Sequence, residues 1–443
     1  MNPKTFIQVI VFCLFLPINA MGWTNHATLA YPIFFSFPEV KNASSIKVET
    51  IEHFLKTEQK GLVRLLYDED VWAKKNIYAY PHSLERIKFR DNILSSELKT
   101  RFLMAIRVNP YSRLVPYIQI LNSDDKKNNT ILNWQDVSLI KSDYKYLDIK
   151  PGEIISAFEI LTTACDEPDN GLDIGVWEDN NTEFGKIYGF GNQPFGNPKL
   201  EYSSQAPFHM GFFHESDIIY LMASFIKKTY VEYRIHLYQS LAKYAFETGH
   251  KYWGFRFMGW GMHYVQDLTQ PYHSTLLPGI SVPSMLWINL LDNIAIRSPK
   301  NDALQLVTNR HLAIENYQYN LLKEAIENYL LNHNLTKALG DSTNDSQYVE
   351  FTNLTPRNVI SKKSNSYANE TDKILERCLP KRLVSEPSYI FEKTEPDINV
   401  LSEIRKNEPE AEKILEELLI KLLVPAGAHS RNYFRSILPS AQK

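Results

Sequence analysis

Residues 259–274, GWGMHYVQDLTQPYHS, place the strictest condition on how this chain can fold. The run has the aromatic and apolar composition of a buried helix, yet it carries His263, Asp267 and His273 within eleven residues. Buried imidazoles and carboxylates need partners for their polar atoms. Either each is a hydrogen-bonded core residue, or the rest of the chain supplies further groups that gather around them.

The spacing of these three residues favours a shared site. His263 and Asp267 are four residues apart and therefore lie on one helix face. Pro271 has no N–H for the carbonyl of Asp267, so the helix ends or kinks there and can turn His273 back toward the same space. Imidazole and carboxylate groups are zinc ligands. The run is thus a candidate metal-binding segment.

A second pair of this kind lies downstream, in NRHLAIEN, where His311 and Glu315 are again four residues apart. Such pairs are common on solvated helix faces. Here Leu304, Leu312 and Ile314 make the predicted helix amphipathic. Together the two helices would offer three histidines and two carboxylates to one site.

Composition favours a soluble helical protein. Of 443 residues, 44% are hydrophobic and 22% charged, as in globular domains, and Gly is scarcer than Pro or Tyr. Helical periodicity recurs over residues 215–267, with a break near Gly249, and over residues 301–333 and 410–438. No strand-rich block appears, so the expected fold class is all-α. A net charge of −3 gives no basic field for duplex nucleic acid.

The first residues have the pattern of a secretory signal peptide: Lys4, the apolar run FIQVIVFCLFL and then PINAMG. The apolar run is too short for a stable membrane anchor. Cleavage after Ala20 or after Gly22 fits the small-residue rule and would leave Met21 or Trp23 as the first residue. Cys165 and Cys378 would remain in an exported chain, enough for one disulfide, and the sequence leaves their pairing open.

The run MHYVQDLTQPYHS resembles the signature of the zinc-dependent phospholipase C family, whose superfamily also includes single-strand-specific nucleases. Members are all-α bundles around three zinc ions, and their mature chains begin with a Trp whose amine and carbonyl bind one ion. The resemblance implies cleavage between Gly22 and Trp23, after a signal peptide of residues 1–22. It also implies a secreted or periplasmic single all-α domain of residues 23–443.

The resemblance implies further ligands between the first helix and the signature. Asp166 is the first choice for an Asp, with Asp169 and Asp173 as alternatives, and His209 is the first choice for a His, with His214 next. The implied metal-ligand set comprises Trp23, His26, Asp166, His209, His263, Asp267, His273, His311 and Glu315. Other histidines, such as His53, His236 and His429, are interpreted as structural or surface residues.

The resemblance covers residues 160–320 and the first dozen residues after Gly22. Compared with the smallest family members, the chain is enlarged, which implies a helical insertion at about residues 47–150. A polar segment at about residues 338–372 is expected to be a loop. The Gly-, Asn-, Asp- and Pro-rich residues 168–205 are also expected to form a long irregular loop.

The function implied by the resemblance is hydrolysis of a phosphodiester by a zinc-activated water, with Asp166 as the residue that orients or deprotonates that water. Glu315, where the nucleases carry Asp, resembles the phospholipase C branch, which releases diacylglycerol and a phosphorylated head group. A single-strand-specific nuclease and a non-catalytic, zinc-stabilised secreted protein are the alternatives.

The apolar segment of residues 275–296, TLLPGISVPSMLWINLLDNIAI, lies between two ligand-bearing segments. It contains Pro and Asp292, which argue against a membrane span. Either it covers the neighbouring helices, or Trp287, Leu290 and Leu291 dip into a lipid surface beside the site. The second interpretation predicts a peripheral membrane contact with a phospholipid substrate.

Overall fold

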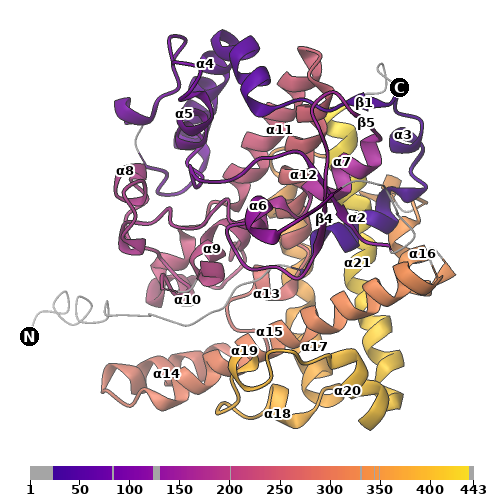
Figure 1. Cartoon of the computed structure of the whole chain (residues 1–443). Coiled ribbons are helices and arrows are strands. Elements are labelled where there is room, and N and C mark those ends of the chain that lie inside the picture. Colours follow the sequence, from indigo (N-terminus) through magenta and orange to yellow (C-terminus); the bar gives the residue numbers. More distant parts are fainter. Residues whose placement is uncertain are drawn as a thin grey trace, which may run out of the picture.

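A computed structural model describes residues 23–81, 84–122, 130–199, 201–329, 332–343, 345–348 and 350–438. The chain is mostly helical, with 63% helix and 4% strand, so the predicted all-α class is confirmed (Figure 1). The proposed signal peptide, residues 1–22, lies outside the described residues.

A helical hairpin forms the middle of the molecule. Helix α11 (Val231–Glu247) packs against α12 (Lys251–Asp267), and the predicted break falls between them at Gly249. Gly249 has φ +86°, a left-handed conformation that suits glycine at a helix end. Every residue of α12 from Tyr252 to Asp267 is buried. The signature run is therefore at the centre of the fold.

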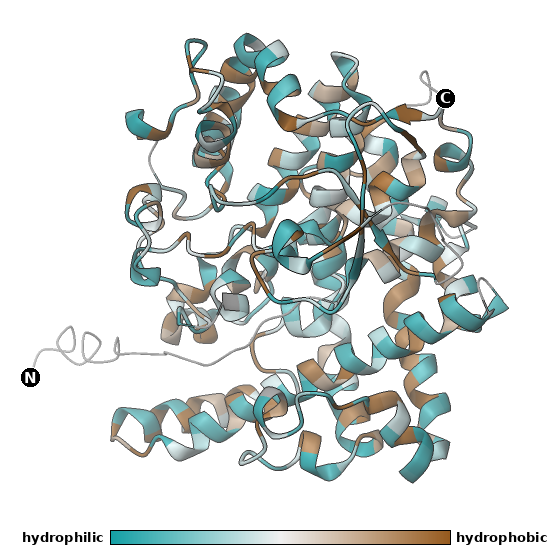
Figure 2. Ribbon diagram, viewed as in Figure 1, coloured by the Kyte–Doolittle hydropathy of each residue, from teal (hydrophilic) through white to brown (hydrophobic). Residues whose placement is uncertain are grey.

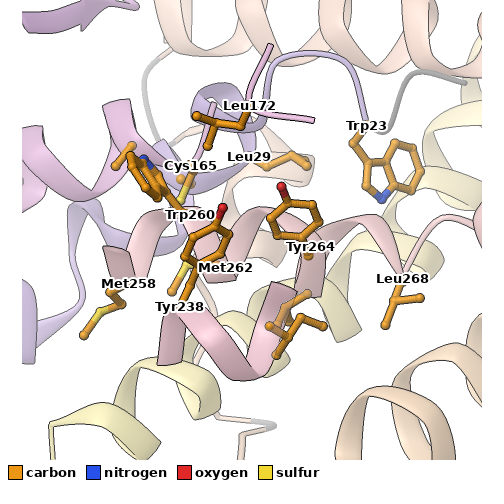
Figure 3. Close-up of a cluster of buried hydrophobic side chains, with 14 of the residues drawn as sticks. Trp23, Leu29, Cys165, Leu172, Tyr238, Met258, Trp260, Met262, Tyr264 and Leu268 are labelled. Atoms are coloured by element: carbon orange, nitrogen blue, oxygen red, sulfur yellow. The ribbon is translucent and has the colours of Figure 1, made fainter. Parts of the chain in front are cut away.

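Two other helices pack against α12, namely α7 (Ala157–Ala164) and the long α21 (Pro409–Ile437), and α2 (His26–Phe35) packs against both of these in turn. A Cβ at Gly259 would lie 2.5 Å from the Cβ of Ala164, so only glycine lets α12 approach α7 this closely. Figure 3 shows Trp260 and Tyr264 along α12 and Leu268 just after its end, with Trp23 and Leu29 on neighbouring segments. One buried apolar cluster runs from Trp23 to Ile437.

The segment expected as a helical insertion is a mixture of helices and short strands. Its helices are α4 (Ile51–Asn76), α5 (Leu98–Ala105) and α6 (Trp134–Val137), and α3 (Pro38–Lys41) precedes it. Strands β2 (Tyr117–Ile120), β4 (Lys145–Asp148) and β3 (Ile131–Leu132) form an antiparallel sheet in that order, and β1 (Ile46–Lys47) pairs with β5 (Ile154–Ile155). Strands of two to four residues are too short for their alternation to be recognised in sequence.

The described part of the predicted irregular segment, residues 168–205, contains three short turns of helix and the start of α9 (Glu201–His209). The turns are η3 (Glu167–Asn170), η4 (Glu178–Asn180) and α8 (Gly185–Tyr188), and α9 is followed by α10 (Asp217–Met222) and η5 (Ser224–Lys227). A second, smaller apolar cluster joins α9 and α10 to Met285 and Leu304.

After the signature run, the chain forms α13 (Pro271–Ser274), α14 (Val282–Asn293) and the long α15 (Ser298–Glu324). Helix α14 projects at the lower left of Figure 1, and apolar residues lie along it in Figure 2. Within the described part of the chain, no helix is both long enough and apolar enough to cross a membrane.

The polar loop expected at about residues 338–372 is not a loop for most of its length, and this prediction was wrong. Helix α17 (Lys362–Cys378) occupies its second half, after the π-helical turn η9 (Pro356–Ser361). The buried face of α17 includes Ser364, Ala368 and Thr371, small or polar residues at helical spacing, so the periodicity was hidden by polarity. The remaining helical elements are η2 (Glu85–Ile87), η6 (Ala325–Tyr329), α16 (Asn334–Gly340), η8 (Asp345–Gln347), α18 (Lys381–Val384), α19 (Phe391–Thr394) and α20 (Val400–Asn407).

Cys165 and Cys378, whose pairing the sequence does not determine, do not form a disulfide. Cys165 caps the C-terminus of α7 and Cys378 ends α17, and both are free and buried.

Candidate metal centre

The centre begins with the three residues of the signature run, as the spacing predicts. Helix α12 ends at Asp267, and Pro271 is the first residue of α13, which returns His273 to the same side. His263 Nε2 lies 3.3 Å from one oxygen of Asp267, and His273 Nδ1 lies 3.5 Å from the other. All three side chains have no exposed surface.

Two further histidines face the same carboxylate. His26, the first residue of α2, has its Nε2 3.4 Å from Asp267 Oδ1. His209, the last residue of α9, has its Nδ1 2.9 Å from Asp267 Oδ2 and 3.1 Å from His263 Nε2. Each oxygen of Asp267 thus faces two imidazoles. This is the arrangement expected of a carboxylate that bridges two metal positions.

The acidic residue beside His209 and His263 is Asp169. Asp169 is predicted from sequence only as an alternative to Asp166. Asp169 Oδ1 lies 3.6 Å from His263 Nε2 and 3.9 Å from His209 Nδ1. Asp166 Oδ1 instead accepts a 2.8 Å hydrogen bond from the backbone N–H of His26. Asp166 therefore anchors the start of α2, and the three-residue step through η3 brings Asp169 to the centre.

The downstream pair completes the cluster. His311 and Glu315 lie on α15 and are buried, and His311 Nε2 is 2.6 Å from Glu315 Oε1 without the alignment of a hydrogen bond. The ring of His273 lies 5.1 Å from that of His311. The two pairs recognised separately in sequence are thus adjacent.

The described residues contain three adjoining groups of possible metal ligands, and within each group the ligand atoms lie within 4.8 Å of one another. These groups are His26, His263 and Asp267; Asp169, His209 and His263; and His273, His311 and Glu315.

The other predicted or alternative ligands lie around these groups. Trp23 is fully buried, and its indole N–H donates to Thr269 Oγ1 at 3.0 Å, just beyond α12. His214 contacts the carbonyl of Arg357 at 2.9 Å and belongs to none of the three groups. Asp173 accepts hydrogen bonds from Arg234 and lies behind His209.

Hydrogen bonds to backbone and side-chain oxygens fix the imidazole rings. Nδ1 of His263 donates to the carbonyl of Cys165 at 2.8 Å, and Nδ1 of His26 donates to Oε1 of Gln266 at 2.9 Å. These acceptors place the proton on Nδ1, so the Nε2 lone pair points into the cluster. Gln266 is in turn bonded to Ser430 of α21 at 3.3 Å. Such supporting groups orient metal ligands in many proteins.

Beneath His209 lies a buried ion pair. Arg234 Nη2 is 2.6 Å from Asp173 Oδ1, and the hydroxyl of Tyr264 donates to Asp173 Oδ2 at 2.6 Å. His209 Nε2 faces the same carboxylate oxygen at 3.6 Å. This contact directs His209 Nδ1 toward Asp267. The sequence contained no signal for this support beyond the choice of Asp173 as an alternative ligand.

Burial and mutual charge set the protonation of the cluster. Burial, together with the charges of Asp267 and Asp169, raises the pKa of Glu315 well above its usual value. Burial lowers the pKa of His311 well below normal, and the nearby His273 lowers it further. Burial alone would raise the pKa of Asp267, but the facing imidazoles hold it well below its ordinary value. A neutral imidazole and an ionised carboxylate are the forms that bind metal.

Several ligand-type atoms of the cluster are buried without a hydrogen-bond partner. These atoms are Nε2 of His26 and His311, Oδ1 of Asp267 and both carboxylate oxygens of Glu315. Buried polar atoms rarely stay unsatisfied, and a buried carboxylate without a partner is costly. A bound cation would satisfy them together, so the residues present fit a metal site.

Comparison of the chain with protein-family models, with curated proteins and with solved structures gives no match. Any function must therefore be inferred from the side chains of the cluster and from the surfaces around it.

Proposed function

We propose that this chain is a secreted zinc-dependent phosphodiester hydrolase, most closely resembling a phospholipase C. The observation that carries the proposal is the set of three adjoining, buried histidine–carboxylate groups with unpartnered ligand atoms. Nitrogen and oxygen donors of this kind suit zinc, whereas calcium and magnesium favour oxygen alone.

The proposed ligands follow the three groups. Asp267 would hold one ion with His26, its other oxygen, which faces His209 and His263, would help those residues and Asp169 to hold a second, and His273, His311 and Glu315 would hold a third. The resemblance adds the amine and carbonyl of Trp23, which requires cleavage between Gly22 and Trp23 during export. The burial of Trp23 beside α12 supports its place near this centre.

When bound, zinc lowers the pKa of a coordinated water toward neutrality and neutralises the charge of a phosphodiester. The chain's own contribution is orientation and proton transfer. Asp169 is the one member of the three groups whose side chain is partly exposed, at 18%. We therefore assign to Asp169, in place of Asp166, the role of orienting the attacking water and accepting its proton.

A lipid substrate is supported by the surface of α14. Trp287 is 60% exposed, Leu290 is 52% exposed and Ile294, just after the helix, is 61% exposed. Large apolar side chains grouped on one projecting helix mark interaction surfaces. A phospholipid bilayer is the partner proposed here, because α14 directly links the segments that carry His273 and His311.

Replacing both Trp287 and Leu290 by Glu should weaken binding to phosphatidylcholine vesicles at least about tenfold, since each large side chain gains about 1.5–3 kcal/mol when it leaves water. Hydrolysis of a soluble phosphodiester should be unchanged. The matched control replaces Tyr67 and Leu94, which are 62% and 68% exposed elsewhere on the molecule, by Glu. Vesicle sedimentation measures the affinity, and equal binding by both double variants would argue against the lipid surface.

A single-strand-specific nuclease is the second candidate function. Tyr144, Tyr202 and Tyr319 are half-buried, and the rings of Tyr144 and Tyr319 lie 5.9 Å apart. Burial raises the pKa of Tyr144 well above its usual value, and the charge of nearby Asp166 adds to the effect. Aromatic rings near a metal centre are typical stacking platforms for unpaired bases.

One parallel assay separates the candidates. The mature protein, with its first residue checked by mass, is given phosphatidylcholine vesicles or single-stranded DNA, each with and without a zinc chelator. Release of diacylglycerol that the chelator abolishes is the expected result. Cleavage of DNA alone would identify the nuclease, and inertness toward both substrates with zinc retained would leave a zinc-stabilised, non-catalytic protein.

A further inference from the structure

A second histidine–carboxylate cluster lies outside the metal centre, at the surface. It consists of Glu49, His53 and His250, and their ligand atoms also lie within 4.8 Å of one another. Glu49 immediately precedes Thr50, the N-cap of α4, and His53 lies in the first turn of that helix. His250 is the residue before α12. Two segments far apart in the sequence, residues 49–53 and residue 250, are thus brought together.

Both imidazoles face the same oxygen. His250 Nδ1 is 2.7 Å from Glu49 Oε1, and His53 Nδ1 makes a close contact with that same atom. One carboxylate oxygen that receives two imidazole nitrogens is a compact N,N,O donor set. Imidazole nitrogens together with a carboxylate favour zinc and its neighbours in the first transition series over calcium or magnesium.

The ring of His250 is held in place from behind. Its Nε2 contacts Glu58 Oε1 at 3.3 Å, and the hydroxyl of Tyr244 donates to the other oxygen of Glu58 at 2.6 Å. The ring of Phe54 lies edge-on to it at 5.1 Å. In this structure Nδ1 donates to Glu49 Oε1 at 2.7 Å, and a cation that takes the place of that proton would bind Nδ1 while Nε2 keeps its proton for Glu58. A carboxylate behind a histidine is the usual support of a metal ligand.

The cluster opens onto a surface cavity of about 730 Å³, whose lining includes Lys47, Gly152 and Lys251 beside the three residues. The His53 side chain is 68% exposed, whereas those of Glu49 and His250 are 16% and 10% exposed. An ion held here would be reached directly from solvent. Three protein donors would leave one coordination position open to the cavity.

We propose that Glu49, His53 and His250 bind one divalent transition-metal ion, with zinc as the best fit, and that Glu58 is the positioning residue for His250. The site is separate from the buried centre, and a water or small anion in the cavity completes its coordination. His53, interpreted from sequence as a structural or surface residue, is thereby a metal ligand.

The test uses the full mature protein, rinsed with a weak chelator that removes accessible ions, and titrates it with zinc chloride in a calorimeter. The wild type should bind one equivalent that His53→Ala does not bind, or binds at least about tenfold more weakly. Thr57→Ala is the matched control, an exposed neutral residue one turn further along α4, and it should bind like the wild type. Thermal unfolding of both variants should match the wild type because both positions are exposed.

An anomalous map at the zinc edge, from crystals soaked in zinc, gives a second measurement. A peak between Glu49, His53 and His250 is expected. Equal binding by wild type and His53→Ala, or zinc at the buried centre with none at Glu49, would overturn the proposal. The difference of one equivalent between the two proteins does not depend on hydrolysis, so a failure of the proposed hydrolase function would leave this result standing.

Discussion

Replacing Asp267 by Asn is expected to remove the two zinc ions assigned to Asp267 and to lower the rate of phosphodiester hydrolysis by more than about 100-fold, which exceeds the effect of losing a supporting group. Each oxygen of Asp267 faces two imidazoles, so the change removes the negative charge shared by His26, His209, His263 and His273. Elemental analysis gives the zinc per chain, and initial rates on a soluble phosphodiester give the activity.

The control is the same chemical change at Asp91, which is exposed. Asp91→Asn should keep full zinc and full activity. The thermal midpoint adds a further readout: chelation should lower it in the wild type, because the buried ligand atoms lose their cation, and should hardly change it in Asp267→Asn. Wild-type zinc and turnover in Asp267→Asn would refute the proposed centre.

The second large effect separates the two acidic residues near η3. Asp169→Asn should remove the ion shared with His209 and His263 and lower turnover by more than about 100-fold. Asp166→Asn should keep its zinc, because an amide oxygen can still accept the hydrogen bond from the backbone of His26. Its cost should appear in unfolding instead, as a loss of about 1 kcal/mol, because the hydrogen bond is then made to a neutral group.

Both variants are compared by zinc content, hydrolysis and denaturant unfolding. If Asp169 is the ligand, Asp169→Asn loses zinc and activity. Asp166→Asn then keeps its zinc and loses only stability toward denaturant. The reverse pattern, with zinc lost from Asp166→Asn and kept by Asp169→Asn, would restore the assignment drawn from sequence.

The parts of the centre that sequence predicted are those fixed by local geometry. The four-residue spacing of His263 and Asp267 places both on one face of α12, and Pro271 has to end that helix. The same spacing places His311 with Glu315 on α15. These relations depend only on residues close in the chain, so no knowledge of the fold was needed to find them.

What sequence could not determine depends on contacts between distant segments. Asp166 and Asp169 are both aspartates and could ligate a metal equally well. Only the fold shows that Asp166 accepts a hydrogen bond from the backbone of His26 instead of facing the cluster. Glu49 and His53 are four residues apart, but His250 lies about 200 residues further along the chain, and no spacing links it to that pair. Helix α17 was missed because its buried face is rich in small and polar side chains.

The bond between Gln266 and Ser430 has a consequence for how the protein is made. Gln266 orients the ring of His26, and it is itself held by α21, which lies more than 160 residues further along the chain. A growing polypeptide therefore lacks this support for His26 until translation has passed residue 430. We expect metal uptake by the proposed centre to follow the folding of α21 instead of guiding the first stages of folding.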